Sequence, residues 1–322
     1  MKDVTRGLLC VALTTILFSM MEVTLKGVSA HFHPVQINFT RFLIGGLVLL
    51  PFALRALRRR EADAPRLDGA ALLKMAGLGF VGVFVSMTFY QLSVNLTDAS
   101  VVAILFSGNP LFVMLFAALL LGEPIRRCNV AALVLELLGI LVIVSPWHMQ
   151  LDPCGVLFVL LAVLAFALYG VLGKKEGAKF GVVVTTCFGF LLGSLELMAA
   201  ALLTHISAVA AFLQSTPLAG YADIPFFSGY SPEILPAFLF VCVGVTGIGY
   251  LSYFKAMDYT SAGMASLVFF FKPVLAPILA FLLLQEAIPG NRIAGILIIL
   301  AASLINLSPA LAAHRRKGTL QK

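Results

Sequence analysis

The segment 265–286, ASLVFFFKPVLAPILAFLLLQE, constrains the structure of this chain more than any other. It is long enough to cross a membrane, because about 20 helical residues cover the hydrocarbon core of a bilayer. Lys272 and Pro273 lie near its middle. A charge at that depth costs roughly 2.5–3.5 kcal/mol on insertion scales, and a proline inside a helix removes a backbone hydrogen bond. The segment therefore predicts a membrane-spanning helix that carries a polar site and a kink.

A second copy of this segment occupies 102–123 and reads VAILFSGNPLFVMLFAALLLGE. An offset of 163 residue numbers aligns Pro110 with Pro273 and Asn109 with Lys272. We predict that both prolines kink their helices. Duplicated, interrupted helices of this kind are typical of secondary transporters, which bind substrate near the membrane midplane.

The composition is that of a membrane protein. Of 322 residues, 61% are hydrophobic and 11% are charged, whereas soluble domains are roughly 45–50% apolar and about 25% charged. The net charge of +7 does not indicate nucleic-acid binding, because the basic residues lie in separate loops. The five cysteines are scattered, and the chain has neither a P-loop nor an HExxH motif. We therefore expect a protein without a metal or cofactor that is not an enzyme.

Apolar runs predict an all-α integral membrane protein with ten transmembrane helices. These spans lie at 7–29, 34–54, 69–94, 98–121, 128–145, 154–173, 180–204, 234–255, 260–284 and 291–311.

The basic residues of the loops predict the orientation. They gather in alternate loops, at Arg55, Arg58, Arg59, Arg60, Arg66, Arg126, Arg127, Lys174, Lys175, Lys179 and Lys255. Both termini are basic as well, and the opposite loops hold almost no positive charge except Arg292. We expect a multi-pass protein of the plasma membrane, the inner membrane in a bacterium, with both termini in the cytoplasm.

The two halves of the chain repeat each other. Repeat 1 covers 7–145 with spans 1–5, and repeat 2 covers 154–311 with spans 6–10. The offset between them changes from 148 to 163 within 205–233, so we expect an inserted external loop there. Five spans per repeat is an odd number, which predicts two inverted-topology repeats. Inverted repeats allow a structure to open alternately to either side of the membrane.

These features resemble the EamA-domain family of the drug/metabolite transporter superfamily. The resemblance rests on LLLGEPI at 119–125, LLLQEAI at 282–288 and RFLIGGLVLLP at 41–51, together with the order and duplication of the spans. It covers about 7–311. It implies a helical bundle around a central cavity, with spans 5 and 10 at the periphery, that moves small metabolites, often amino acids, without hydrolysing ATP.

Charged residues inside spans usually pair with one another or face water. Six lie well inside the spans, namely Glu22, Lys26, Arg41, Glu136, Glu196 and Lys272. We expect Lys272 either to bind a substrate carboxylate, to exchange a proton with a carboxyl partner, or to form a structural ion pair. Glu136 in the peripheral span 5 is a candidate for a structural role or for the interface of a homodimer.

Glu22 and Arg41 lie at similar depth on consecutive antiparallel helices, so an ion pair between them is expected. Lys26 lies one turn after Glu22 on the same face. The three residues form an outer gate or the upper wall of the cavity, or else a static pair with Lys26 reaching to the interface. Glu123 and Glu286 end their helices near the two surfaces, where we expect them to bind loop amides.

Small polar and aromatic side chains are weaker candidates. Polar groups in apolar helices either bind a ligand or hold helices together; these are Asn38, Ser107 and Asn109. Tyr90 and Tyr253 are equivalent under the 163 offset and predict paired cavity walls, unless they and Tyr169 anchor the membrane interface. Of the three consecutive phenylalanines, we take Phe271 as the one that lines the cavity.

The function predicted first is a secondary transporter that exports small metabolites, above all amino acids or related carboxylate-bearing compounds, by alternating access. Its partners are a small-molecule substrate and the lipid bilayer, with no nucleic acid. One alternative is an exporter of hydrophobic or cationic drugs on the same fold, in which Glu22 or Glu196 is the binding charge. The other is a membrane sensor that binds a ligand without transporting it.

Overall fold

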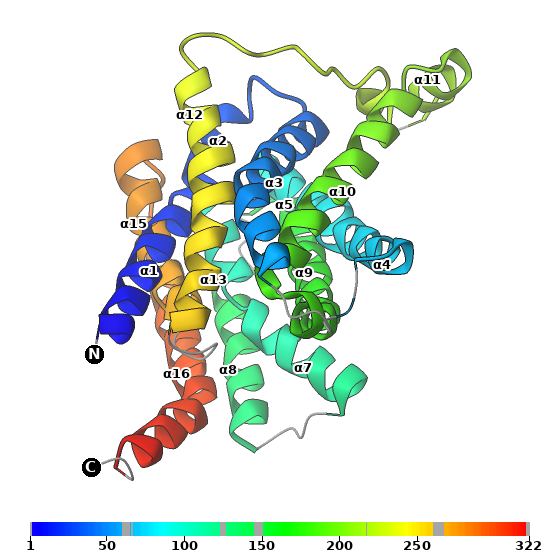
Figure 1. Ribbon diagram of the computed structural model, residues 1–322. Helices are drawn as coiled ribbons and strands as arrows, with labels where there is room; N and C mark the ends of the chain where they lie inside the picture. The colour runs from blue at the N-terminus through cyan, green and yellow to red at the C-terminus, as the bar shows by residue number, and fades with distance from the viewer. Residues whose placement is uncertain are drawn as a thin grey trace.

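The computed structural model describes residues 2–59, 65, 67–122, 127–144, 151–216, 218–259 and 267–319, and within these ranges the chain is helical and contains no β-strand. Figure 1 shows the elements in chain order. The α-helices are α1 (Lys2–Ser19), α2 (Met21–Val28), α3 (Pro34–Arg58), α4 (Gly69–Gly79), α5 (Met87–Leu96), α6 (Ala99–Phe106), α7 (Asn109–Leu121), α8 (Arg127–Val144), α9 (Pro153–Phe180), α10 (Val182–Leu203), α11 (Ser207–Gln214), α12 (Leu235–Leu239), α13 (Tyr250–Tyr259), α15 (Leu267–Leu284) and α16 (Gly290–Thr319).

Within the described residues, seven helical segments are long and apolar enough to cross a membrane. They are Val4–Val28, Pro34–Arg58, Gly69–Leu96, Ala99–Leu120, Pro153–Phe180, Val182–Leu203 and Leu235–Ala256. Three shorter apolar helices are Val130–Ile143, Phe271–Leu284 and Gly290–Ala302. The expectation of an all-helical, multi-pass membrane protein is therefore confirmed. The arrangement of ten spans as two inverted repeats stays a prediction.

Local signals in the sequence explain where several helices begin and end. Asp68 caps α4 by accepting a hydrogen bond of 2.8 Å from the amide of Ala71. Asp152 caps α9 in the same way, since a short acidic side chain satisfies the free amides of a helix N-terminus. Gly122 ends α7 and Gly181 separates α9 from α10, both at positive φ values, which glycine adopts at no steric cost.

Two helices are wound as π-helix near their middles. The segment η1 (Phe80–Ser86) joins α4 to α5, and η3 (Phe240–Gly249) joins α12 to α13. Shifted by 163 residue numbers, the first falls at 243–249, inside the second. In η3 the hydroxyl of Thr246 donates to the carbonyl of Val241 at 2.9 Å. The two π-helical segments thus occupy corresponding positions in the two halves of the chain. Such turns occur often at functional sites.

Glycines allow some helices to touch through their backbones. A Cβ atom at Gly79 of α4 would lie 2.5 Å from the carbonyl oxygen of Gly189 and 2.7 Å from the amide nitrogen of Gly193, both in α10. At Gly295 of α16, a Cβ would lie 2.9 Å from the carbonyl oxygen of Gly139 in α8. Small residues at such crossings are typical of membrane helices. These contacts pair α4 with α10 and α8 with α16, which lie side by side in Figure 1.

The predicted insertion contains α11 and the short 3₁₀ helix η2 (Ala219–Tyr221). Its later part packs on the start of α3, where the amide nitrogen of the Gln36 side chain donates to the carbonyl of Ser228 at 2.8 Å. His33 caps α3 through Nδ1, and its Nε2 lies 3.1 Å from the carbonyl oxygen of Gly220. The ring of Tyr230 packs edge-on against Phe32 at 4.9 Å. The loop therefore covers the connection between α2 and α3.

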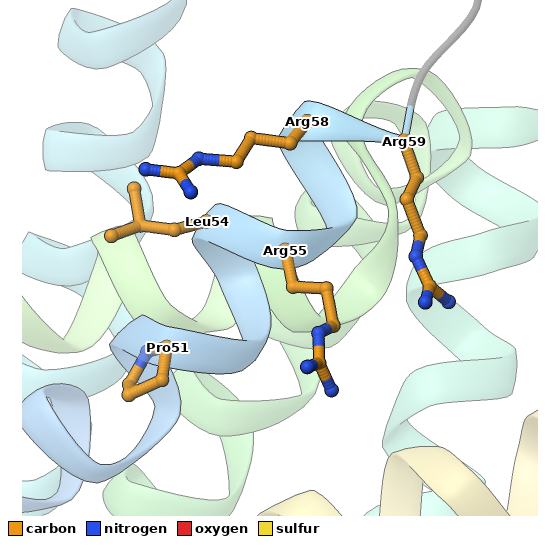
Figure 2. A pocket seen from close by; sticks show the side chains of 5 residues that line it. All are labelled: Pro51, Leu54, Arg55, Arg58 and Arg59. Carbon is orange, nitrogen blue, oxygen red and sulfur yellow. The ribbon is translucent and has the colours of Figure 1, made fainter.

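At the other end of α3 the surface carries a pocket of about 400 Å³ (Figure 2). It is lined by Pro51, Leu54, Arg55, Arg58 and Arg59.

Candidate functional site

Two buried opposite charges, far apart in the sequence, meet in the core of the bundle. Nζ of Lys272 in α15 lies 2.5 Å from Oε1 of Glu22 in α2, and the two side chains are only 1% and 0% exposed. A buried charge is tolerated when it is paired. The pairing with Glu22 is compatible with two of the three alternatives considered for Lys272, namely proton exchange with a carboxyl partner and a structural ion pair.

The same carboxylate accepts a second short hydrogen bond. The hydroxyl of Tyr90 in α5 donates to Oε1 of Glu22 at 2.6 Å. The rings of Tyr90 and Phe106 pack edge to face at 5.0 Å, and Nζ of Lys272 lies 5.4 Å from the centre of the Phe106 ring. Helices α2, α5, α6 and α15 thus converge on one acid, whose second oxygen, Oε2, has no hydrogen-bond partner within the described part of the chain.

Arg41 of α3 is the second buried cation of this region, with 1% of its surface exposed. Its Nη2 lies 3.2 Å from the sulfur of Met87, and its guanidinium carbon lies 4.5 Å from the centre of the Phe42 ring and 6.0 Å from that of Tyr90. Among the described residues, nothing accepts a hydrogen bond from its Nε or Nη1. Arg41 thus keeps hydrogen-bonding capacity that the described residues do not use.

The expected ion pair between Glu22 and Arg41 is wrong. Glu22 is paired with Lys272 and Tyr90 instead, and the described residues contain no direct contact between Glu22 and Arg41. Depth along consecutive helices suggested the pair, but depth does not say which way a side chain points. It also ignores α15, which follows α2 by more than two hundred residues and packs beside it.

Lys26 is not part of this buried cluster. Its ammonium donates to the carbonyls of Val94, Asn95 and Thr97 at 2.8, 3.2 and 2.9 Å. These carbonyls lie at the end of α5, where a helix leaves acceptors unsatisfied and favours a positive charge. Lys26 therefore caps α5 from α2, a role that its spacing from Glu22 did not suggest.

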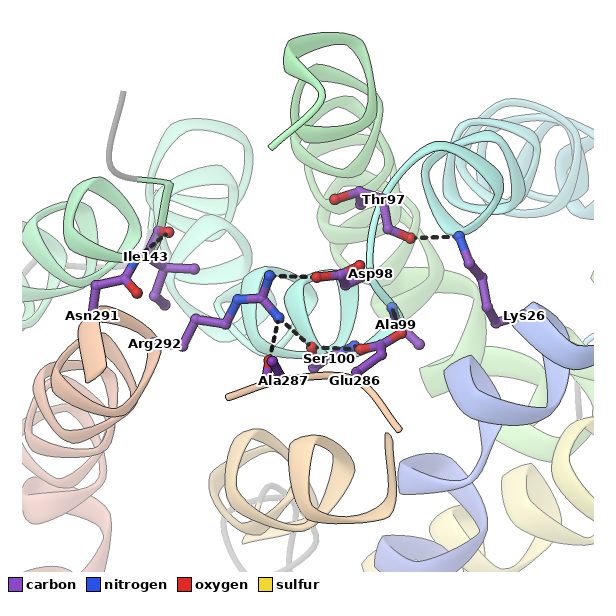
Figure 3. A network of polar contacts seen from close by, with 10 residues as sticks. All are labelled: Lys26, Thr97, Asp98, Ala99, Ser100, Ile143, Glu286, Ala287, Asn291 and Arg292. Carbon is purple, nitrogen blue, oxygen red and sulfur yellow. Dashed lines mark hydrogen bonds and ion pairs between the residues drawn. The ribbon is translucent and has the colours of Figure 1, made fainter. Parts of the chain in front are cut away.

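A polar network connects the start of α6 to the connection between α15 and α16 (Figure 3). Glu286 accepts hydrogen bonds from the amides of Ala99 and Ser100 at 2.8 and 3.1 Å and from the Ser100 hydroxyl at 2.7 Å. The expectation that Glu286 binds loop amides is confirmed, whereas Glu123 lies outside the described residues. Arg292 of α16 forms an ion pair with Asp98 and donates to the carbonyl of Ala287 at 3.1 Å.

Sequence reasoning missed the role of Arg292 and Asp98 in this network. The sequence did single out Arg292, because it is a basic residue in the set of alternate loops that otherwise hold almost no positive charge. The short connection between α5 and α6 is therefore bound from both sides, by Lys26 at the Thr97 carbonyl and by Arg292 at Asp98 (Figure 3).

The small polar candidates have different surroundings. The side-chain amide of Asn38 donates to the carbonyl of Met87 at 2.7 Å, so Asn38 meets the same residue as Arg41. The Ser107 hydroxyl donates to the carbonyl of Ala103 at 2.7 Å, within its own helix. Asn109 is 6% exposed, and its side-chain oxygen has no hydrogen-bond partner in the described part of the chain.

The tyrosines predicted as paired walls are not equivalent. Tyr90 contacts Glu22, whereas the ring of Tyr253 packs against Phe269 at 5.9 Å. The ring of Tyr169 packs against Phe166 at 5.6 Å. Both are packed among helices, which differs from the interfacial anchoring considered above.

Phe271, the phenylalanine assigned to the cavity, is 48% exposed. It forms an exposed apolar stripe with Val274 and Ile278 along α15. Because i, i+3 and i+7 share one helix face, this stripe lies apart from the buried face that carries Lys272.

The two prolines do not interrupt their helices in the same way. In the first copy the helix is broken at 107–108, and Pro110 lies in the first turn of the new helix α7, a position where a missing amide costs nothing. In the second copy α15 continues through Pro273, and a further proline, Pro277, follows one turn later. The expected kink is thus a helix break in the first copy.

No group of three or more His, Cys, Asp or Glu side chains in the described residues could hold a metal ion. The side chain of Glu136 lies outside the described residues.

Comparison with known proteins identifies the family. An "Uncharacterized transporter" of Clostridium kluyveri is 30% identical and covers 94% of this chain and 93% of its own length. The "Pseudopaline exporter CntI" of Pseudomonas aeruginosa is 33% identical over 44% of this chain and 47% of its own. The "S-adenosylmethionine uptake transporter" of Rickettsia prowazekii is 24% identical over 56% of this chain and 58% of its own. The model of the EamA-like transporter family matches residues 5–145 and 153–308, and the chain belongs to this family of membrane transporters.

Proposed function

We propose that the chain is a secondary transporter that exports a small carboxylate-bearing metabolite, such as an amino acid, across the plasma membrane by alternating access. In this proposal ten spans form two inverted repeats, 7–145 and 154–311, with the external insertion at 205–233. Both termini face the cytoplasm, in keeping with the distribution of loop charges. Export is favoured over uptake because the relative with the higher identity, over the part it matches, is named an exporter.

The proposed substrate class rests on the balance of buried charges near Arg41 and Lys272. Lys272 and Arg41 are cations, and Glu22 is paired with Lys272. Among the described residues no acidic group lies within ion-pair distance of Arg41, although the Glu22 carboxylate is near enough to interact with it electrostatically. A substrate carboxylate would supply the missing negative charge. The planar guanidinium matches a carboxylate in a bidentate manner. The sequence assigned this role to Lys272, and the pairing of Lys272 with Glu22 moves it to Arg41.

The pair between Lys272 and Glu22 would then serve the conformational cycle. It joins α2 of the first repeat to α15 of the second, and alternating access requires the repeats to move relative to each other. Substrate bound at Arg41 would act on the pair through Tyr90, whose hydroxyl donates to Glu22 and whose ring centre lies 6.0 Å from the Arg41 guanidinium carbon.

One observation favours the second candidate, a transporter of lipophilic cations. Oε2 of Glu22 is buried and has no hydrogen-bond partner in the described residues, so a cationic drug could bind there if Lys272 moved away. The two candidates make opposite demands on the substrate charge.

The experiment that separates them compares cells with and without the protein. Exported metabolites are compared by untargeted mass spectrometry, and accumulation of labelled amino acids is compared with that of a labelled lipophilic cation. The proposal expects a carboxylate-bearing compound outside the cells that express the protein, with no change in the cation. Exclusion of the cation alone would support the second candidate, and a solute that binds without crossing would indicate a sensor.

A further inference from the structure

The end of α3 carries three arginines within five residues, and all three line one pocket. Arg55 and Arg59 extend in the same general direction from the last turn, while Arg58 extends past Leu54 (Figure 2). All three side chains are exposed, and none has an acidic partner in the part of the chain that the structure describes. The pocket, of about 400 Å³, thus concentrates positive charge that no acidic side chain of the described residues pairs with.

The pocket has an apolar side as well as a charged one. Leu54 and Pro51 form part of its wall, and the same helix exposes Leu47 by 50% and Phe52 by 38%. Large exposed apolar residues on a spanning helix face lipid. The pocket therefore lies where the apolar surface of α3 ends and the basic residues begin, at the depth of lipid headgroups.

A fourth cation from another helix lies nearby. Nζ of Lys255, in α13, lies 5.8 Å from the centre of the Phe52 ring. Lys255 also interacts electrostatically with Asp258 of its own helix, so its contribution is smaller than that of the three arginines. A single anion near these residues would still be attracted by cations from two helices.

We propose that this pocket binds the headgroup of an anionic phospholipid. The guanidinium groups of Arg55, Arg58 and Arg59 hold the phosphate through charge-assisted hydrogen bonds, and the acyl chains lie along Leu54 and the exposed apolar side chains of α3. Basic pockets beside membrane helices attract acidic headgroups at about 1 kcal/mol per basic residue. A free phosphate ion would gain nothing from the apolar wall, which is why the pocket fits a lipid better.

Native mass spectrometry of the full chain in neutral detergent tests this proposal. The protein is titrated with phosphatidylglycerol, with phosphatidylcholine of the same acyl chains, and with inorganic phosphate. The test variant combines Arg55→Gln, Arg58→Gln and Arg59→Gln. The matched control combines Lys74→Gln, Arg127→Gln and Lys175→Gln, which removes three exposed basic residues outside the pocket.

The unmodified protein should bind phosphatidylglycerol more tightly than phosphatidylcholine, and the test variant should lose about tenfold or more of that affinity. The control should keep it, and millimolar phosphate should not displace the lipid. Equal losses in the test variant and the control would overturn the proposal, as would displacement by phosphate. If the test variant does not fold, the single variant Arg58→Gln replaces it. A lower preference for phosphatidylglycerol over phosphatidylcholine in that variant supports the proposal, and an unchanged preference overturns it.

Discussion

Lys272 of α15 and Glu22 of α2 form a buried ion pair in which Nζ and Oε1 are 2.5 Å apart. The pair explains how a lysine can lie in the middle of an apolar helix. It also joins the two halves of the sequence at one point, since α2 lies in the first matched region of the family and α15 in the second.

Removal of one partner of this pair should be more harmful than removal of both. Lys272→Met leaves Glu22 buried without its cation, and such losses cost about 3–5 kcal/mol. The double variant Lys272→Met with Glu22→Gln removes both charges and should recover a large part of the loss. Thermal unfolding in detergent measures both variants. If the double variant is no more stable than Lys272→Met, the charges do not compensate each other.

The contact between α4 and α10 predicts a contrast between two glycines on one helix. Gly79→Ala places a Cβ 2.5 Å from the backbone oxygen of Gly189, and overpacking of this kind costs about 1–3 kcal/mol. Gly77→Ala is the matched control, because nothing lies within 4 Å of its Cβ position. The unfolding temperature of Gly77→Ala should equal that of the unmodified protein or lie slightly above it, since alanine favours the helix more than glycine does. Equal unfolding temperatures for the two variants would contradict this packing.

The cap on α6 predicts local protection of two amides. Glu286→Ala removes the acceptor of the Ala99 and Ser100 amides. Hydrogen bonds to a charged group contribute about 1.5–3 kcal/mol, so hydrogen exchange at these amides should accelerate about tenfold or more. Gln285→Asn is the control, because residue 285 is exposed and its positive φ of 56° suits asparagine. Unchanged exchange in Glu286→Ala would show that the cap does not protect α6.

The loop at 205–233 should detach from the start of α3 at low pH. Burial lowers the pKa of His33 below its usual value of 6.5, so folding favours the neutral ring. That form donates from Nε2 to Gly220 and accepts from Val35 at Nδ1. This stability is complete above pH 6.5, and it is lost as the pH falls toward the lowered pKa.

Hydrogen exchange of residues 218–230 at neutral and acidic pH measures this effect. His33→Asn keeps a cap acceptor but does not titrate, so its loop should respond less to pH. The contact between His205 and Asp223, with nitrogen and oxygen 3.8 Å apart, is present in both proteins and therefore does not account for a difference between them. An equal response in the unmodified chain and His33→Asn would mean that another group controls the loop.

The sequence predicted well whatever depends on local patterns. Apolar runs gave the helices, since each predicted span contains an apolar helix. The end of a helix near a surface gave the role of Glu286. The sequence did not predict contacts between helices that are far apart in the chain. The partner of Glu22 was predicted on the neighbouring helix, but α15 supplies it.

Backbone details were also beyond the sequence. The π-helical turns at Phe80–Ser86 and Phe240–Gly249 depend on how each helix packs, and their residues show no pattern that separates them from α-helix. Lys26 was judged by its spacing from Glu22, whereas its role depends on where α5 ends. In each case the observed structure depends on a neighbouring residue that belongs to another helix.

The most direct test of the central claim is transport by Arg41 variants in proteoliposomes loaded with the exported carboxylate compound. Arg41→Gln should fold and lose about tenfold or more of transport, because it loses charge-assisted hydrogen bonds of about 1.5–3 kcal/mol. Arg41→Lys should recover only part of it, since lysine lacks the planar fork. Lys74→Gln, which removes an exposed lysine of α4 outside both sites, controls for the loss of one charge. Wild-type transport by Arg41→Gln would contradict the claim that Arg41 binds the substrate carboxylate.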